Sequence, residues 1–245
     1  MQKRGQLSIF VIIAILLVAG IFLALYLTGT IFEESVPREE VEAFNEGVRG
    51  IKVFVSDCVG QVGDEGLMLI GQQGGYYSLP EASTDSIPYY YFEGQNVMPS
   101  KSKIEEEVSS YMNDKLSECA TIQNFEEQGF SINEKAVDTK TTILQDKVIL
   151  DVKWPVVVSK ASLKATLSST RKEFLIRIGR IYDISKEITE KQVEDPGRIC
   201  LSCITLLASE NNLKIDMDPS IEEKSFAYSI EDGEYEFKFA HKYAV

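Results

Sequence analysis

An apolar segment near the N-terminus constrains this sequence more than any other feature. It covers residues 7–27, and residues 9–27 contain no charged side chain. As a helix, twenty-one residues rise roughly 30 Å, which matches the hydrocarbon core of a bilayer. Backbone groups in hydrocarbon must be hydrogen-bonded within the segment, so a single run of this kind must be helical. The segment predicts a transmembrane helix, with residues 1–28 forming a cytoplasmic leader and the membrane span.

Charges on the two sides of the segment predict its orientation. Lys3 and Arg4 precede it, whereas Glu33 and Glu34 follow it. Because basic residues flanking a membrane helix favour the cytoplasmic side, we expect the N-terminus in the cytoplasm and the C-terminal domain outside the cell. The predicted localisation is therefore the cell membrane. A cleaved secretory signal is the main alternative, but its apolar region usually has about 7 to 15 residues.

The six residues that enter the segment, KRGQLS from Lys3 onward, resemble the class III signal peptide of type IV pilin-like proteins, especially archaeal ones. The resemblance is limited to about the first 27 residues. It implies cleavage by a prepilin peptidase between Gly5 and Gln6, and a membrane-anchored cell-surface protein. Phe10 stands where such signals commonly carry Glu. The absence of this Glu argues against filament formation more than against cleavage. An uncleaved signal anchor is the alternative interpretation.

The charge of the chain limits its partners. The sequence carries a formal net charge of −13 at pH 7, and 44% of its residues are hydrophobic, which suffices for a core. An acidic surface repels phosphate backbones, so nucleic acid is not expected as a partner. The partners that remain are the membrane, contacted by the N-terminal helix, and protein surfaces, either further copies of this chain or another surface protein.

The cysteines are even in number, and the predicted topology places them all on the oxidising side of the membrane. Disulfides are therefore expected among Cys58, Cys119, Cys200 and Cys203. Three pairings are possible, and we favour Cys58 with Cys119 and Cys200 with Cys203. The Cys-x-x-Cys spacing of the second pair also occurs in zinc and redox sites. However, four-cysteine zinc sites usually contain two such pairs, and no βαβ pattern surrounds this one. We predict structural disulfides and no metal site.

Hydrophobic periodicity divides the rest of the chain into three predicted regions. Residues 29–62 form an amphipathic stalk helix, because apolar side chains recur every three or four positions. Residues 63–125 combine glycine-rich breaks, an aromatic loop and a further helix. Residues 126–245 form an α+β ectodomain with an antiparallel sheet. The predicted fold class is α+β, with a long N-terminal transmembrane and stalk helix followed by helices and an antiparallel β-sheet.

Local signals predict several elements within the last two regions. A Ser-x-x-Glu capping box that starts at Ser102 begins a helix ending near residue 120. Strands on both sides of residues 146–147 form a hairpin, and Trp154-Pro155 places a bulge or a sheet edge in its second strand. A helix is expected over residues 171–193. A second hairpin turns at Asp232-Gly233.

An aromatic cluster is the most interface-like feature outside the N-terminal helix. Tyrosine offers a large contact area with a polar tip, and glycine and proline surround this cluster. If exposed, the cluster would suit a glycan or another protein subunit. The alternative is that alternate rings face the core of a short edge strand. The residues are Tyr76, Tyr77, Tyr89, Tyr90, Tyr91 and Phe92.

The sequence contains no diagnostic catalytic motif. Its single histidine, His241, alternates in phase with two phenylalanines and is interpreted as a core imidazole, and no EF-hand or nucleophile elbow appears. We expect no catalytic residue and no cofactor. The leading hypothesis is a membrane-anchored structural protein of the cell surface, either a pilin-like filament subunit or an envelope assembly component. The alternatives are an uncleaved surface binding module for a protein or glycan, and a thiol–disulfide oxidoreductase that uses Cys200 and Cys203.

Overall fold

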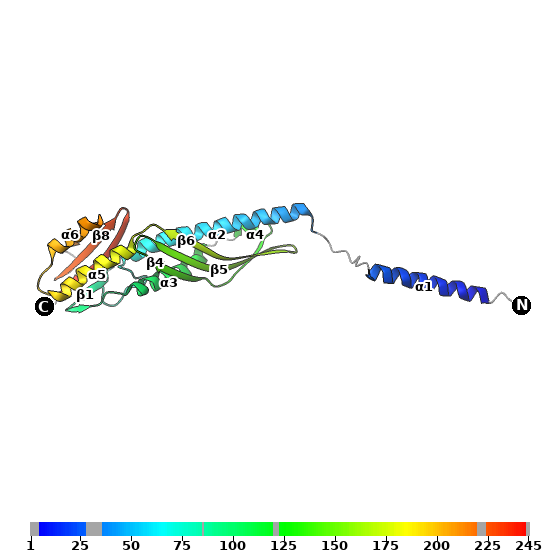
Figure 1. Ribbon diagram of the computed structural model, residues 1–245, viewed down its shortest axis with the longest axis horizontal. Helices are drawn as coiled ribbons and strands as arrows, with labels where there is room; N and C mark the ends of the chain where they lie inside the picture. The colour runs from blue at the N-terminus through cyan, green and yellow to red at the C-terminus, as the bar shows by residue number, and fades with distance from the viewer. Residues whose placement is uncertain (1–4, 28–35, 85, 120–122, 220–223, 244–245) are drawn as a thin grey trace. The chain divides into compact units, whose positions relative to one another are not determined.

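The computed structural model describes residues 5–27, 36–84, 86–119, 123–219 and 224–243, and for residues 5–9, 25–27 and 123–124 it describes the backbone only. The chain divides into two compact units, Met1–Asn45 and Glu46–Val245. In chain order, the described elements are α1 (Gly5–Leu27), α2 (Arg38–Gln72), β1 (Tyr89–Phe92), β2 (Gln95–Asn96), α3 (Lys101–Cys119), α4 (Gln123–Glu126), β3 (Ser131–Glu134), β4 (Asp138–Ile143), β5 (Val148–Lys160), β6 (Leu163–Phe174), α5 (Ile178–Glu194), α6 (Leu201–Asn211), β7 (Lys214–Asp218), β8 (Ser225–Asp232) and β9 (Tyr235–Lys242) (Figure 1).

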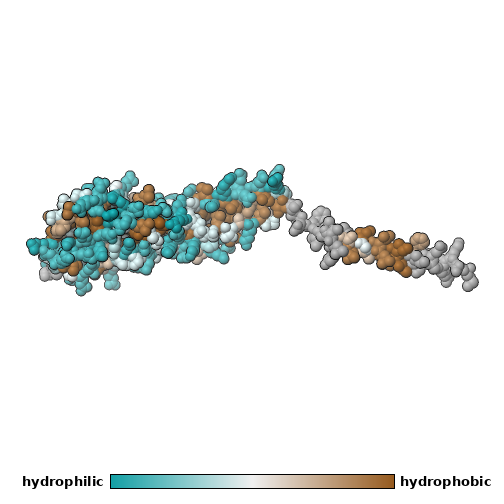
Figure 2. Space-filling view, in the orientation of Figure 1, coloured by the Kyte–Doolittle hydropathy of each residue, from teal (hydrophilic) through white to brown (hydrophobic). Residues whose placement is uncertain are grey.

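Within the described residues, no helix is both long enough and apolar enough to cross a membrane. The side chains described in α1 run from residue 10 to residue 24 and are hydrophobic (Figure 2). The absence of such a helix from the described part of the chain overturns the predicted transmembrane stalk and, with it, the predicted cell-membrane localisation with an extracellular C-terminal domain. The α+β composition that the sequence predicted is present.

Helix α2 continues through glycines at which the sequence suggested a break. Gly63 and Gly66 lie where the rings of Phe174 and Tyr111 contact the helix backbone, and a Cβ atom at either position would overlap the ring. Glycine lowers the intrinsic stability of a helix by about 1 kcal/mol relative to alanine, but here it allows aromatic side chains to pack directly on the backbone. Packing therefore extends α2 to Gln72.

Helix α3 covers an edge of one sheet with polar side chains. The helix is capped by Ser100, whose Oγ accepts the N–H of Lys103 at 3.2 Å, so the expected capping box at Ser102 lies inside the helix instead. Three α3 side chains spaced four residues apart accept alternate N–H groups of β4, which satisfies an edge that could otherwise pair with another strand. The pairs are Glu105 with Ile143 at 2.8 Å, Ser109 with Thr141 at 3.1 Å and Asn113 with Thr139 at 2.9 Å.

Strand β5 is the centre of that sheet. It pairs antiparallel with β3 and β4 on one side and with β6 on the other, which confirms the expected hairpin between β4 and β5. The pairing with β6 shifts between Lys153 and Val156, so Trp154-Pro155 forms a bulge and does not mark a sheet edge. Residues 171–174 pair with β5 as part of β6, and the helix expected from residue 171 begins only at Ile178.

The other sheet has the strand order β2-β1-β9-β8-β7 within the described residues. The β8–β9 hairpin is antiparallel as predicted, but β1 pairs parallel to β9, so the expectation of a purely antiparallel sheet is wrong. Helices α5 and α6 lie against this sheet (Figure 1). Its inner side chains include Tyr90, Tyr228, Phe237 and Phe239, which are almost completely buried. This sheet and its helices position the site described next.

Candidate functional site

The disulfide between Cys200 and Cys203 is the most chemically distinctive group in the described part of the chain. Helix α5 ends at Glu194, Pro196-Gly197 turns the chain, and α6 begins at Leu201 with Cys200 as its N-cap. The two Cα atoms are 5.3 Å apart. This bond and the Cys58–Cys119 bond between α2 and α3 are the two disulfides that the sequence favoured, and both are confirmed.

The sulfur of Cys200 lies at the N-terminal end of α6. The backbone N–H of Cys203 donates a hydrogen bond to Cys200 Sγ at 3.3 Å, and Ser202 Oγ lies 3.6 Å from the same sulfur. Unpaired N–H groups give a helix N-terminus a partial positive charge, which stabilises a thiolate and lowers the pKa of a cysteine there. If the disulfide were reduced, Cys200 would be the better stabilised thiolate.

A partly buried chain of hydrogen bonds holds the loop before the disulfide. Tyr228 is hydrogen-bonded to Tyr243, whose hydroxyl donates to Gln192 Oε1 at 2.9 Å. Gln192 Nε2 then donates to the carbonyls of Asp195 at 3.0 Å and Arg198 at 3.3 Å. Burial raises the pKa of both Tyr228 and Tyr243, so both phenols stay protonated. Three segments therefore hold the loop in place: β8 through Tyr228, the residue after β9 through Tyr243, and α5 through Gln192. The sequence linked none of these segments to the cysteines.

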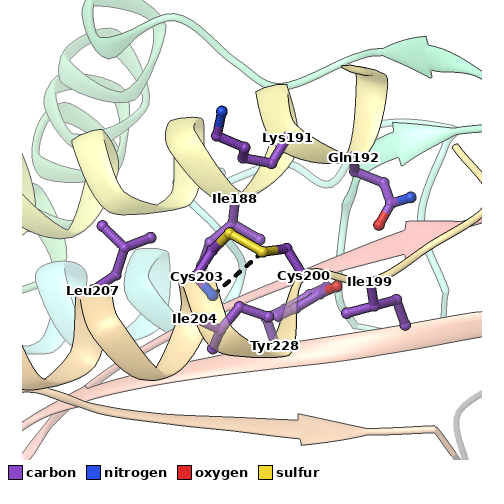
Figure 3. Close-up of a pocket in the computed structure, with 9 residues that line it drawn as sticks. All are labelled: Ile188, Lys191, Gln192, Ile199, Cys200, Cys203, Ile204, Leu207 and Tyr228. Atoms are coloured by element: carbon purple, nitrogen blue, oxygen red, sulfur yellow. Dashed lines mark hydrogen bonds between the residues drawn. A yellow bond between two sulfur atoms is a disulfide. The ribbon is translucent and has the colours of Figure 1, made fainter. Parts of the chain in front are cut away.

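The cavity beneath the disulfide is small. Its volume is about 10 Å³, roughly enough for one water molecule. No small organic molecule fits there, so the chemistry available at this place is that of the disulfide itself. Its walls come from α5, α6, the loop between them and β8 (Figure 3). They are formed by Ile188, Lys191, Gln192, Ile199, Cys200, Cys203, Ile204, Leu207 and Tyr228.

Charges around the disulfide are paired locally. Lys191 forms an ion pair with Glu194 at 3.0 Å, and this hydrogen bond raises the pKa of Lys191. Arg198 forms an ion pair with Asp195, also at 3.0 Å. Both pairs are well exposed, so water and salt screen them. The partial positive charge at the N-terminus of α6 is therefore the main electrostatic influence on Cys200.

This disulfide contributes less to the stability of the fold than the Cys58–Cys119 disulfide does. In the chain-entropy model, closing its loop, with a sequence separation of 3, contributes about 2 kcal/mol, whereas the Cys58–Cys119 loop, with a separation of 61, contributes about 4 kcal/mol. Stabilisation of the fold is thus a weaker reason for the Cys200–Cys203 bond than for the Cys58–Cys119 bond.

Two larger hollows lie on the other sheet and offer no comparable chemistry. One of about 360 Å³ covers β4, β5 and β6, and its charges pair across the strands, as in Lys153 with Asp138 at 3.4 Å and Arg171 with Asp151 at 3.3 Å. The other, of about 410 Å³, lies between α3 and β4 and is wide open. Among the described residues, no group of three or more His, Cys, Asp or Glu side chains could hold a metal ion.

The tyrosine cluster contributes mainly to the core. Tyr89, Tyr90 and Tyr91 are at most 2% exposed, and Tyr90 stacks on Phe239 with 4.7 Å between ring centroids. A glycan or protein interface was expected only if the cluster was exposed. The three tyrosines of β1 are buried, so they do not meet this condition. The other three members, Tyr76, Tyr77 and Phe92, are partly exposed.

The expected processing site falls at the edge of the described region. Gly5 and Gln6 are the first residues of α1, and only their backbone is described. Lys3 and Arg4, the basic half of the signal-like sequence, lie outside the described residues, as do Glu33 and Glu34. Cleavage between Gly5 and Gln6 stays a prediction.

Comparison of this chain with family models, with curated proteins and with solved structures finds no match.

His241 lies next to Tyr228, which lines the cavity at the disulfide. Thr189 Oγ1 donates to the carbonyl of Ser185 at 2.8 Å, so it accepts from His241 Nε2–H at 3.1 Å, which defines the neutral Nε2–H tautomer. Within the described residues, Nδ1 has no hydrogen-bond partner. The ring centroids of Tyr228, Phe239 and Tyr91 lie 4.7 Å, 5.5 Å and 5.7 Å from that of His241. Burial lowers the pKa of His241 to about 3, and the interpretation as a core imidazole is confirmed.

We expect His241 to make the fold sensitive to mild acid. Because its pKa is lower in the folded state, the unfolded chain binds the proton more readily, so the stabilisation is complete above about pH 6.5 and is lost as the pH falls toward 3. The free energy of unfolding should fall by up to about 1.4 kcal/mol per pH unit between about pH 6 and pH 5. Urea unfolding at several pH values measures this slope.

The His241→Phe variant is the control for this slope. It keeps a buried ring but cannot titrate, while the carboxylates with lowered pKa values, such as Glu107 and Glu236, are the same in both proteins. The free energy of the variant should fall less steeply than that of the native protein over this pH interval, because only the carboxylates remain to titrate. An equal slope in the two proteins would show that other groups cause it.

Proposed function

We propose that this protein is a structural subunit that assembles with further copies of itself through α1. The proposal rests on one observation about that helix. Every side chain described in α1, from residue 10 to residue 24, is apolar and exposed when the helix is considered by itself. Phe22, for example, is 71% exposed and Leu16 is 66% exposed. Its described side chains are hydrophobic around the whole circumference of the helix, one side of which is visible in Figure 2.

A helix with this surface must be covered. An amphipathic helix needs contact along one stripe, whereas a helix that is apolar all round is stable only when it is surrounded. Burying one Val, Leu, Ile or Phe side chain completely contributes about 1.5–3 kcal/mol. The large apolar side chains that α1 exposes are Phe10, Val11, Ile12, Ile13, Ile15, Leu16, Leu17, Val18, Ile21, Phe22 and Leu23. Together they provide a strong drive for association.

Further copies of the same helix meet this requirement. Each copy brings an apolar surface of equal length, and several identical helices packed together cover one another on every side. Gly20 helps, because a Cβ atom at that position would meet nothing within 4 Å and the missing side chain lets a neighbouring helix approach closely. The likeness of the sequence around Gly5 to pilin-like proteins supports the same proposal.

The second unit suits the body of such a subunit. Its two disulfides support folding in an oxidising compartment, and Cys58–Cys119 joins the two helices α2 and α3. The acidic balance of the chain, with a net charge of −13, keeps such bodies soluble and limits non-specific association between them. Association is then directed to α1.

A matched pair of valine variants tests the proposal. Val18 in α1 is 54% exposed and Val53 in α2 is 55% exposed, so Val18→Asp and Val53→Asp make the same change at equally exposed positions. In an assembly through α1, Val18→Asp would bury an unpaired carboxylate, and the dissociation constant should rise by about 100-fold or more. Val53→Asp should leave the constant unchanged. Sedimentation of the full chain over a range of concentrations measures both.

Two results would overturn the proposal. One is a native chain that stays monomeric at all concentrations. The other is an assembly that the two aspartate substitutions weaken equally, because the contact would then not involve α1 specifically.

A further inference from the structure

We propose that the Cys200–Cys203 disulfide exchanges with thiols of a cysteine-bearing polypeptide and oxidises a pair of them to a disulfide. This activity is independent of assembly through α1, because it rests on the start of α6 in the second unit. Four features of the site support it, namely the accessibility of the bond, its apolar surroundings, the placement of Cys200 and the rigid loop before it.

The disulfide is accessible to a thiol from the solvent but not from the cavity behind it. Both cysteines are partly exposed, and the cavity behind them has room for about one water molecule. A thiol must therefore approach from the solvent side. Leu201, between the two cysteines, is 62% exposed, and Leu206 on the same helix is 56% exposed. Exposed leucines beside a reactive bond favour an extended or unfolded polypeptide over a small hydrophilic thiol.

The placement of Cys200 defines the direction of exchange. A thiolate of the partner attacks Cys200 Sγ, a bond forms between these two sulfurs, and the bond between Cys200 and Cys203 breaks. Cys203 leaves with the electron pair and takes up a proton. The second thiolate of the partner then attacks the partner sulfur of the mixed disulfide, and Cys200 leaves as a thiolate. The partner loses two electrons and gains a disulfide, while the cysteine pair gains two electrons and becomes a dithiol.

Cys200 is well suited to leave in the second step. The N–H of Cys203 already donates to its sulfur at 3.3 Å, and the hydroxyl of Ser202 is 3.6 Å away. A thiol with a low pKa leaves faster in thiol–disulfide exchange. These donors are present before the reaction, so the site requires no rearrangement to stabilise the product.

The surrounding structure does not depend on the bond. Gln192 donates to the carbonyls of Asp195 and Arg198, and the hydroxyl of Tyr243 donates in turn to Gln192 at a partly buried position. The disulfide closes a loop with a sequence separation of only 3. We therefore expect the reduced protein to keep α6 and both cysteines in place, as repeated exchange requires.

The first experiment uses the full chain and a reduced peptide that carries two cysteines flanked by apolar residues. One equivalent of peptide disulfide should form per chain, and mass spectrometry should show Cys58–Cys119 still intact. At about pH 7, the exchange should be at least about tenfold faster than with oxidised glutathione at the same concentration. The Cys200→Ser/Cys203→Ser variant should abolish it. A rate equal to or below that of glutathione would overturn the proposal, because a structural disulfide reacts slowly.

The second experiment compares the two single-cysteine variants. Cys203→Ser leaves the thiol of Cys200 and Cys200→Ser leaves that of Cys203, on the same turn of the same helix. The pH profile of alkylation by iodoacetamide should place the pKa of Cys200 at least about one unit below that of Cys203. Adding Ser202→Ala to the Cys203→Ser variant should raise the pKa of Cys200. Equal and ordinary pKa values for the two thiols would contradict the assigned roles.

Discussion

Replacing both Cys58 and Cys119 by serine should lower the free energy of unfolding by about 4 kcal/mol. The bond joins α2 to the end of α3 across a sequence separation of 61, with 6.0 Å between the Cα atoms. Removing it frees a long loop in the unfolded chain, and the entropy of that loop grows with its length. Cys58 is 4% exposed, so the loss of its packing adds to the effect.

The other disulfide provides the control for this prediction. The Cys200→Ser/Cys203→Ser variant also loses one disulfide and gains two hydroxyl groups, but its loop is short, so the free energy should fall by only about 2 kcal/mol. Urea unfolding of the two variants under oxidising conditions measures the difference. Equal losses would indicate that the length of the closed loop does not determine the stabilisation.

Replacing Tyr90 by alanine should destabilise the protein by about 3–5 kcal/mol. Its side chain is completely buried, its ring stacks on Phe239 at 4.7 Å, and the ring of Phe237 lies at 6.4 Å. The hydroxyl donates to the carbonyl of Gly74 at 2.8 Å, where the chain turns after α2. The substitution therefore removes aromatic packing and a buried hydrogen bond that ties this turn to the sheet.

Two further variants separate these contributions. Tyr90→Phe keeps the ring and leaves the Gly74 carbonyl without its donor, which should cost about 1–3 kcal/mol. Tyr77→Ala removes a partly exposed ring whose hydroxyl donates to Asp114 at an exposed position, and it should cost less than Tyr90→Ala. Thermal or urea unfolding gives all three values. A Tyr90→Ala variant as stable as the native protein would mean that β1 does not belong to the core.

Local patterns in the sequence were sufficient where neighbouring residues decide the structure. The favoured pairing of Cys119, at the end of the helix predicted to stop near residue 120, with Cys58 on the preceding helix is correct. Alternating side chains and turn residues predicted the β4–β5 and β8–β9 hairpins, whose strands are close in the sequence. The missing N–H of proline predicted either a bulge or a sheet edge at Trp154-Pro155, and the strand is bulged there.

Contacts between distant segments decided the features that the sequence did not reveal. Residues 171–174 have a pattern that fits a helix, but they pair with β5 and become strand. Strand β1 has four residues, and nothing within it indicates that it runs parallel to β9, more than a hundred residues later. The glycines of α2 suggested a break, yet the rings of Phe174 and Tyr111 pack on them and the helix continues.

The candidate site shows the same division. The spacing of Cys200 and Cys203 is visible in the sequence, and it predicted a local disulfide correctly. The hydrogen-bonded chain of Tyr228, Tyr243 and Gln192 was not visible, because its members come from three segments that meet only in the folded protein.

The sequence by itself determined the apolar side chains of α1, the acidic charge of the chain and most local elements, and it favoured the observed disulfide pairing over two alternatives. These properties depend on composition and on periodicities of two to four residues, which can be read along a single strand or helix. Only the tertiary structure decided the mixed sheet, the length of α2 and the setting of Cys200. The physical reason is that strand pairing and side-chain packing depend on which distant residues are brought together, and a local pattern carries no information about its partner.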